Sequence, residues 1–354
     1  MKFPFKSIGL ATLLATFVQC ASVQNSEEYI ELPLSGKQNF GSYHVYDDSQ
    51  YFLFTETEKR FDNRTATTIL RDLNNSDKEL LRIEGVYRHS AFVGGRLFLV
   101  VEKYNSKQNP DSSQYEFYNI NVDDFKVETK HAWAIENSFI HGLAFDSESI
   151  GCIFYRSSGD PYDSKVLFTK TGGEEWDEIE LNRPVLKVQK NQNSLWINSY
   201  YRRNDQNIIY KFGTETGIED SISLECYIAD ILVNNDIEVE FISKSESLTY
   251  FYAKNQEAKF NKIVVTDDDD FKPVKLVGYG ENRFIFGLNS RSHNNGGLAA
   301  SEKILLFSQN SGETWDAKQL DIRCQFNTIS VFENILTMYL GNGVLQKLDL
   351  SVRP

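Results

Sequence analysis

The chain has 354 residues, enough for one large domain or for two smaller ones. Its formal net charge of −13 argues against nucleic acid and against an anionic membrane surface as partners. Aromatic residues make up 13% of the chain, with 18 Tyr and 25 Phe, and this enrichment favours β-strands.

Residues 1–22 have the pattern of a signal peptide. Two lysines precede a short apolar run at residues 8–18, and small residues follow it. Gln19 stands where a bacterial lipoprotein needs a small residue before its cysteine, so we read Cys20 as part of the signal. No apolar run in residues 23–354 reaches the ~20 residues that a membrane span needs. We therefore expect no transmembrane segment in the mature chain, which would reach the secretory lumen or be secreted.

Glycosylation and cysteine use fit the same route. Asn63 and Asn74 each begin an Asn-x-Ser/Thr sequon, consistent with a glycoprotein of the eukaryotic secretory pathway. Cys152, Cys226 and Cys324 remain after removal of the signal. An oxidising compartment permits one disulfide among these three, and the sequence does not choose the pair.

Turn signals recur along the chain at intervals of about 47 residues, the length of one four-stranded propeller blade. They occupy residues 72–77, 121–125, 169–176, 214–217, 267–271 and 308–315. Short apolar runs between them predict strands at residues 97–101, 116–120, 139–145, 152–155, 165–169, 176–181, 239–242, 248–252 and 262–265. Evenly spaced short strands without a long helical pattern favour a propeller over a sandwich.

Two of these turns share a detailed motif, Ser/Thr-x-Asp-x-Gly-x-Thr-Trp between two strands. Its residues are Thr169, Gly173 and Trp176 in one copy, and Ser308, Asn310, Gly312, Thr314 and Trp315 in the other. The glycine permits positive φ, Asn310 can close the turn on its own backbone, and the Trp can pack between sheets while its N–H finds an acceptor. The first copy departs from the motif at Thr171 and Glu175. This is the Asp-box hairpin of β-propellers, and we interpret it as structural rather than catalytic.

The chain ends suggest how the ring closes. Dividing the mature chain by the period gives about seven blades. The last unit offers only strands at 335–339 and 344–348, and residues 29–34 can supply the missing outer strand. We predict an all-β Asp-box β-propeller of seven four-stranded blades, with six to eight possible, closed by the N-terminal strand.

Local phrases around the second Asp box resemble the sortilin family of vacuolar protein-sorting receptors. They lie at residues 247–251, 261–271, 278–280, 284–287 and 303–306, and the resemblance is clearest over about residues 110 to 320. It implies a lumenal receptor-like propeller on a Golgi, endosomal or vacuolar route. Family receptors usually carry ten blades, a cysteine-rich module, a membrane span and a cytosolic tail. We therefore expect a truncated relative that is too short for ten blades and is without the last three features. No family ligand-binding motif is visible here.

Three functions remain open at this stage. The first is a non-catalytic propeller that binds a lumenal peptide or protein in its tunnel or on one face, with a membrane-bound partner for any sorting role. The second is a glycoside hydrolase, sialidase- or glucanase-like, which needs paired carboxylates or a Tyr nucleophile. The third is a degenerate or structural propeller without cargo.

No residue is assigned to catalysis, to a cofactor or to a metal. The five histidines are scattered without ligand spacing. The aspartates at 267–270 are interpreted as a solvated turn rather than a calcium loop, and residues 200–203 as a turn between strands. Residues 294–297 are interpreted as a loop, because no strand-to-helix context makes them a phosphate cradle.

Overall fold

The computed structural model describes most of the chain between its ends. The described residues are 28–32, 34–35, 37–46, 49–58, 65–74, 78–104, 112–136, 138–157, 164–181, 185–191, 194–201, 206–213, 217–224, 226–235, 238–244, 246–252, 260–268, 270–289, 302–320, 329–332, 335–339 and 344–349. The predicted signal peptide, Asn63, Cys324 and the loop at 294–297 lie outside them.

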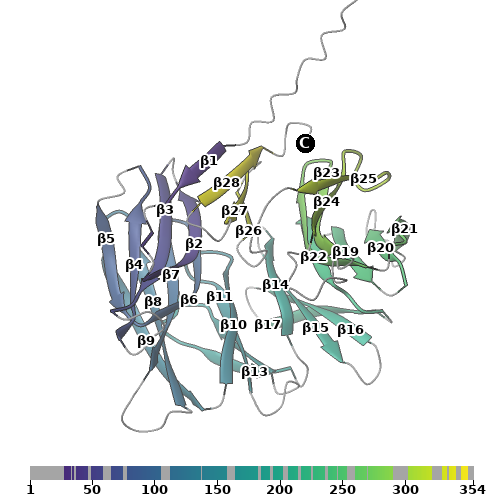
Figure 1. Cartoon of the computed structure of the whole chain (residues 1–354). Helices are drawn as coiled ribbons and strands as arrows, with labels where there is room; N and C mark the ends of the chain where they lie inside the picture. Colours follow the sequence, from purple (N-terminus) through teal and green to yellow (C-terminus); the bar gives the residue numbers. More distant parts are fainter. Residues whose placement is uncertain are drawn as a thin grey trace, which may run out of the picture.

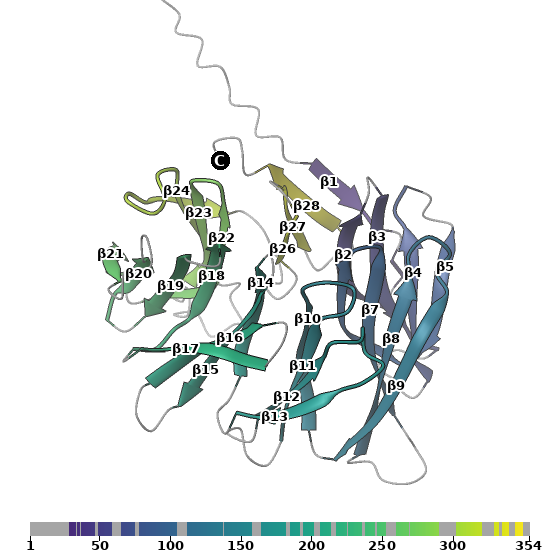
Figure 2. The ribbon, with the colours of Figure 1, turned by 180° about the vertical axis from the view of Figure 1, so that it is seen from behind.

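The described part of the chain forms strands and no helix long enough to cross a membrane, and the strands build seven antiparallel four-stranded sheets around a ring (Figures 1 and 2). Blade 1 contains β2 (Gln38–Tyr46), β3 (Ser49–Glu56), β4 (Thr67–Asp72) and β5 (Glu79–Glu84). Blade 2 contains β6 (Val86–Val93), β7 (Arg96–Tyr104), β8 (Ser112–Asn121) and β9 (Val127–Glu136). Blade 3 contains β10 (Ser138–Phe145), β11 (Gly151–Ser157), β12 (Ser164–Thr169) and β13 (Asp177–Glu180). Blade 4 contains β14 (Val185–Asn191), β15 (Ser194–Tyr201), β16 (Gln206–Gly213) and β17 (Gly217–Leu224).

The remaining strands complete the ring, and the predicted seven-bladed fold is confirmed. Blade 5 contains β18 (Asp230–Asn235), β19 (Glu238–Lys244), β20 (Leu248–Tyr252) and β21 (Asn261–Thr266). Blade 6 contains β22 (Phe271–Tyr279), β23 (Asn282–Asn289), β24 (Glu302–Ser308) and β25 (Asp316–Leu320). Blade 7 contains β26 (Ile329–Phe332), β27 (Ile335–Tyr339), β28 (Val344–Asp349) and, from the other end of the chain, β1 (Glu28–Glu31).

Blade 7 closes the ring as predicted. Strand β1 pairs antiparallel with β28, and Glu28 lies opposite Lys347 while Glu31 lies opposite Val344 (Figure 1). The N-terminal strand therefore covers an edge of β28 that would otherwise be open to pairing with another chain. This contact also ties the two ends of the described chain together.

Contacts between neighbouring blades run mainly between their first strands, β2, β6, β10, β14, β18 and β22. From this we infer that the first strand of each blade lies nearest the centre of the ring. Five of these strands have a β-bulge soon after they begin, which leaves one residue unpaired. The unpaired residues are Gly41, Arg88, His141, Leu186 and Val274. A bulge bends the strand and redirects a side chain, so the inner wall is irregular at one repeated level.

The apolar core lies between the blades. One cluster joins Phe98 and Phe117 of blade 2 to Phe145, Ile153 and Leu167 of blade 3. Strands in the middle of each blade are buried on both faces, which explains their near-continuous apolar runs. The sheets are thus held to one another by side-chain packing, and each blade depends on its neighbours.

One of the recurring turn signals does not lie at the same place in its blade as the others. Residues 121–125 join the third and fourth strands of blade 2, and the predicted turns at 72–77 and 214–217, which lie partly outside the described residues, fall between the third and fourth strands of blades 1 and 4. Residues 267–271, however, follow β21 and lead into β22, so they link blade 5 to blade 6. The third and fourth strands of blade 5 are joined instead by residues 253–260.

Candidate functional site

A hollow of about 220 Å³ lies among the inner strands of blades 3, 4 and 6. It is lined by His141, Gly142 and Leu143 of β10, Phe154 of β11, Val185 and Val188 of β14, and Lys275 of β22. Four of the seven lining residues have apolar side chains, and a histidine and a lysine are among the others; polar atoms nevertheless make up the larger share of its exposed surface. Strands far apart in sequence meet here because the ring places blades 3 and 6 across the centre from each other.

The bulge in β10 shapes this hollow. His141 is the residue left unpaired between Ile140 and Gly142, and its side chain is exposed. At Gly142 a Cβ would approach a ring carbon of Phe154 to 3.2 Å, so the glycine lets that ring line the wall. Phe139, two residues before His141, is 53% exposed, which is unusual for so large an apolar side chain.

Two histidines lie at or near the hollow, and their pKa values are lowered. Although His141 is exposed overall, partial loss of water around its ring lowers its pKa, and the positive charge of Arg156 lowers it further. Burial also lowers the pKa of His89 to about 4, and the charges of His141 and Arg88 act in the same direction. The His89 Nε2–H donates to the carbonyl of Ile140 at 3.2 Å, which fixes its tautomer. The described lining residues include no carboxylate.

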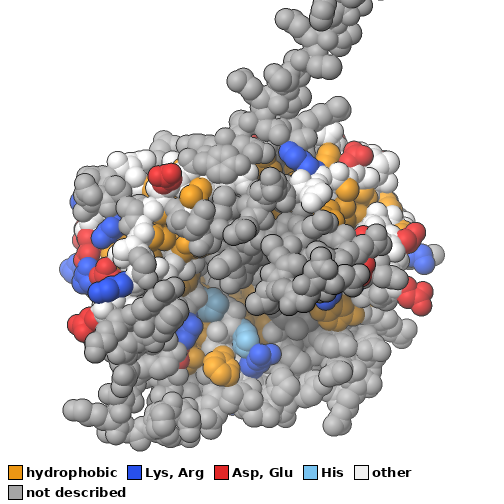
Figure 3. All heavy atoms as spheres, in the orientation of Figure 1, with side chains coloured by type: hydrophobic (Ala, Val, Ile, Leu, Met, Phe, Trp, Pro, Cys, Tyr) orange, Lys and Arg blue, Asp and Glu red, His pale blue; other side chains and the backbone are white. Residues whose placement is uncertain are grey.

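The space-filling view shows this grouping on one face of the molecule. Histidine side chains lie beside Lys or Arg and hydrophobic side chains near the centre of that face (Figure 3). The hollow can bind and orient a ligand, since it combines apolar side chains with a few polar groups.

A second polar cluster joins β2 to β6. His44 Nε2 lies 2.7 Å from the hydroxyl of Ser90 and 2.9 Å from that of Ser42, and the Tyr87 hydroxyl lies 3.1 Å from Ser90. Burial lowers the pKa of His44 to about 4, so its ring is neutral at pH 7. The two hydroxyls contact the Nε2 atom of the buried imidazole, and this cluster holds two blades together.

The second predicted motif forms a closed turn between β24 and β25. The Ser308 hydroxyl accepts the backbone N–H of Gly312 at 2.9 Å, and Asn310 Oδ1 accepts that of Thr314 at 3.0 Å. Gly312 has φ of 87°, a conformation that disfavours a side chain. The Trp315 indole N–H donates to the Gly312 carbonyl at 2.9 Å. Every polar group named in the motif therefore has a local partner.

The first copy makes the same contacts with different side chains between β12 and β13. Thr169 Oγ1 accepts the N–H of Gly173 at 3.0 Å, and the Trp176 indole donates to the Gly173 carbonyl at 2.9 Å. Thr171 Oγ1 accepts the N–H of Glu175 at 2.8 Å, where the other copy uses an amide oxygen. A threonine thus replaces the Asp of the motif without loss of the turn.

Both turns press against the preceding blade. A Cβ on Gly312 would lie 2.2 Å from a ring carbon of Tyr250, and a Cβ on Gly173 would lie 2.1 Å from one of Phe117. Trp315 meets the Tyr250 ring at an angle of 67°, and Trp176 meets Phe117 at 83°. The Trp side chains are half-buried. These residues join blades and show no feature of a reaction centre.

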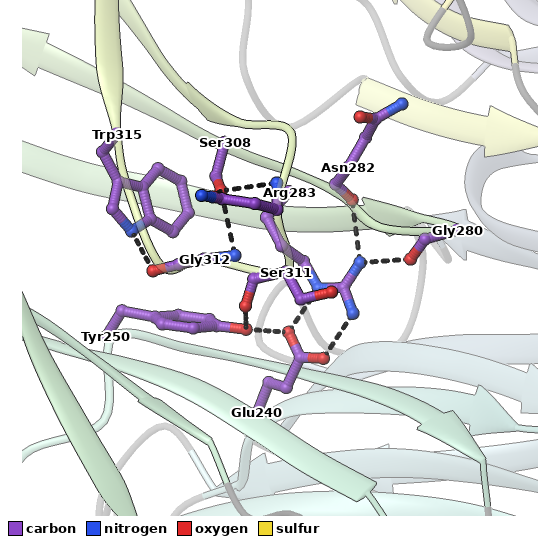
Figure 4. Close-up of polar contacts among 10 residues, drawn as sticks. Glu240, Tyr250, Gly280, Asn282, Arg283, Ser308, Ser311, Gly312 and Trp315 are labelled. Atoms are coloured by element: carbon purple, nitrogen blue, oxygen red, sulfur yellow. Dashed lines mark hydrogen bonds and ion pairs between the residues drawn. The ribbon is translucent and has the colours of Figure 1, made fainter.

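Beneath the second turn lies a buried ion pair that the sequence analysis missed (Figure 4). Arg283 of β23 donates two hydrogen bonds to Glu240 of β19, at 2.6 and 2.7 Å, and the side chains are only 6% and 5% exposed. The Tyr250 hydroxyl donates to the same carboxylate. Arg283 Nη1 also donates to the carbonyls of Gly280 and Asn282, at 2.6 and 2.9 Å.

The seam between blades 2 and 3 has aromatic rings at the matching place. Phe98 occupies the strand position that corresponds to Glu240, and Phe117 the one that corresponds to Tyr250. Gly151 lies opposite Thr169, as Arg283 lies opposite Ser308, and the ring of Phe145 occupies the space above Gly151. Phe98 and Phe145 stack with ring centroids 3.6 Å apart. No local sequence pattern predicts whether a seam between two blades contains a buried ion pair or stacked aromatic rings.

The other predicted residues are ordinary where they are described. Asn74 is exposed in the turn after β4, and its backbone N–H donates to Asp72. Cys152 is buried and Cys226 is half-buried, and both are free thiols. No group of acidic, Cys or His residues in the described ranges could hold a metal, and Lys244 Nζ donates to the Asp268 carbonyl at 2.8 Å.

Comparison with known proteins gives a fold and no family. No family model matches the chain, and no curated protein matches it. Among solved structures, YCF48 bound to D1 peptide is 13% identical with a TM-score of 0.57, covering 92% of this chain and 95% of that one. A prolyl endopeptidase is 13% identical with a TM-score of 0.58, and the match covers 90% of this chain but 48% of that one. BamB from Moraxella catarrhalis is 12% identical with a TM-score of 0.52, covering 89% and 84%. These similarities establish a β-propeller and do not identify a ligand.

Proposed function

We propose that the protein is a non-catalytic binding propeller that holds a polypeptide segment at the centre of its ring. The hollow among β10, β14 and β22 carries this proposal. Its volume of about 220 Å³ suits one or two side chains, and its mixture of apolar side chains and polar groups suits an extended segment. The neighbouring inner strands offer further surface along the ring axis.

The likeness to YCF48 bound to D1 peptide supports a peptide-binding role at the level of fold. The finer part of the proposal rests on the sequence. The signal-peptide pattern and the phrases that resemble sortilins favour a lumenal receptor-like protein of the secretory pathway, with a membrane-bound partner for any sorting role. A glycoside hydrolase would need paired carboxylates at the centre, and the described wall of the hollow instead presents His141 and Lys275.

Binding to an array of random peptides tests the proposal. The full chain, expressed in a eukaryotic secretory system, is compared with Val188→Glu, which places a charge in the hollow. Val264→Glu on β21 is the matched control, because Val264 is 55% exposed and far from the centre. We expect at least about tenfold weaker binding for Val188→Glu, a loss of roughly 1.4 kcal/mol or more, and unchanged binding for Val264→Glu.

Two results would contradict the proposal. Equal binding by both variants, with circular dichroism spectra like the parent, would place the ligand elsewhere. Turnover of sialosides or glucans by the purified protein would replace binding with catalysis. If no peptide binds at all, the structural propeller without cargo becomes the better description.

A further inference from the structure

We propose that a polar cavity at one end of blade 1 binds a single sugar residue. The cavity has a volume of about 300 Å³ and shares no described lining residue with the central hollow, so it stands independently of the proposed function. The sugar can come from two sources, a glycan on the chain itself or a glycan on another molecule. Both present the same chemistry to the cavity.

The cavity lies where the strands of blade 1 begin and end. Its described lining residues are Lys37, which precedes β2; Glu56, Thr57 and Glu58, at the end of β3; Thr65 and Thr67, at the start of β4; and Arg82 of β5. None of these seven is an aliphatic or aromatic residue. The described wall therefore suits a polar ligand rather than an apolar one.

Two of the charges on this wall are held in place by the chain. Arg82 Nε and Nη2 donate to the Glu79 carboxylate, both at 2.7 Å. Glu56 accepts a hydrogen bond from Gln38 Nε2 at 2.8 Å, and its other oxygen lies 3.5 Å from Arg82 Nη1. A carboxylate has about four acceptor positions and a guanidinium has about five N–H donors, so Glu56 and Arg82 keep hydrogen-bonding capacity for a ligand.

The other two charges on the wall are available. Lys37 and Glu58 are exposed, and no hydrogen bond or ion pair to either side chain comes from the described part of the chain. The Thr67 hydroxyl also has no partner among the described residues. Glu84, which lies opposite Thr67 on β5, is ion-paired to Lys103 at 3.3 Å.

The balance of these charges indicates a neutral ligand that is rich in hydroxyl groups. The described wall has two cationic side chains and two carboxylates, which give a charged ligand no net attraction. A sugar hydroxyl both donates and accepts, so it can accept from the cations and donate to the carboxylates. A volume of about 300 Å³ lies at the lower end of the range for ligand pockets, which suits one sugar residue rather than an oligosaccharide.

The sequence has a glycosylation sequon beside the cavity. Thr65, on the wall, is the third residue of the sequon that begins at Asn63. Two residues of chain span at most about 7 Å, so a glycan on Asn63 would begin close to the cavity. The first sugar of that glycan is therefore one source of the ligand, and an external glycan is the other.

Ligand-observed NMR titration with N-acetylglucosamine and with mannose tests the site. The full chain is produced in a eukaryotic secretory system as the parent and as Asn63→Gln, and mass spectrometry measures the glycan on Asn63. We expect Asn63→Gln to bind at least one of the two sugars with millimolar affinity. If the chain's own glycan fills the cavity, the glycosylated parent should bind free sugar at least about tenfold more weakly than Asn63→Gln. Equal binding by the two proteins would assign the cavity to an external glycan.

Matched variants locate the bound sugar. In the Asn63→Gln background, Glu58→Gln and Thr67→Val should each weaken sugar binding about five- to tenfold, because each removes a hydrogen-bonding group from the wall. Glu174→Gln and Thr129→Val are the controls, since they make the same changes on blades 3 and 2 and should leave sugar binding unchanged. Urea unfolding checks that every variant remains folded.

Three results would overturn the proposal. If Asn63→Gln bound neither sugar, the cavity would not be a sugar site. If Glu58→Gln and Thr67→Val bound the sugars as well as their controls do, the sugar would lie elsewhere. If glycine or arginine bound in place of the sugars, the ligand would be a zwitterion rather than a neutral molecule. None of these results bears on peptide binding at the central hollow.

Discussion

Removal of the Arg283 side chain should destabilise the propeller by leaving the Glu240 carboxylate buried without its cation. Glu240 and Arg283 are joined by two short hydrogen bonds, and both side chains are almost completely buried. Breaking such a pair from one side costs about 3–5 kcal/mol, because the remaining charge has lost both water and partner. We therefore expect Arg283→Leu to lower the free energy of unfolding by that amount.

The double variant Glu240→Leu/Arg283→Leu should recover most of this loss. Apolar groups of similar volume often replace a buried ion pair at little cost, and the equivalent seam between blades 2 and 3 is filled by the stacked rings of Phe98 and Phe145. In the parent, the Tyr250 hydroxyl donates to the Glu240 carboxylate, and burial together with that negative charge raises the pKa of Tyr250. In the double variant this hydroxyl loses its acceptor. We expect the free energy of unfolding of the double variant to lie within about 2 kcal/mol of the parent's.

Urea unfolding at pH 7, followed by tryptophan fluorescence, measures these differences. Arg82→Leu is the control, because Arg82 pairs with Glu79 at the surface with 48% of its side chain exposed and should cost about 0–1 kcal/mol. The reasoning would be refuted if Arg283→Leu cost no more than Arg82→Leu. It would also be refuted if the losses from the two single substitutions simply added in the double variant.

Three further predictions concern the turns and the buried histidines. Trp315→Ala should lower the free energy of unfolding by about 2–4 kcal/mol, which is less than for a fully buried Trp because this ring is half-buried against Tyr250. Loss of peptide binding with unchanged urea unfolding would contradict its structural role. Gly312→Ala should lower the free energy of unfolding by about 2–4 kcal/mol, because φ is 87° and the added methyl would lie 2.2 Å from the Tyr250 ring. A urea midpoint equal to the parent's would disprove the close approach. The free energy of unfolding should fall as pH drops from about 6.5 to about 4, because the unfolded chain then binds protons before the folded one does. His44 and His89 each have a pKa of about 4 in the folded state, below the ordinary 6.5, so each should contribute a loss of at most about 3 kcal/mol. Urea midpoints across this range should move less in His44→Gln than in the parent, and an identical pH profile would exclude His44 as a cause.

Local chemistry made much of the fold predictable. The contacts of the Asp-box turn join residues no more than four apart, such as Ser308 with Gly312, so the motif carries its own geometry. Strand runs and their spacing gave the blade count, and the unfinished last unit predicted the pairing of residues 29–34 with the C-terminal strand. The same local chemistry also misled at residues 267–271. The Asp270 N–H donates to Asp268 there as it would in a turn within a blade, although these residues link two blades.

The candidate site and the seams between blades were decided only by tertiary structure. Glu240 and Arg283 belong to different blades, and nothing in either local sequence requires an ion pair where the other seam uses stacked phenylalanines. His141 and Lys275 line one hollow because closure of the ring brings β10 and β22 to the same centre. A turn depends on hydrogen bonds within a few residues, which the sequence specifies directly. Contacts across the ring depend instead on how all seven sheets twist and pack together, so they arise only when the whole chain has folded.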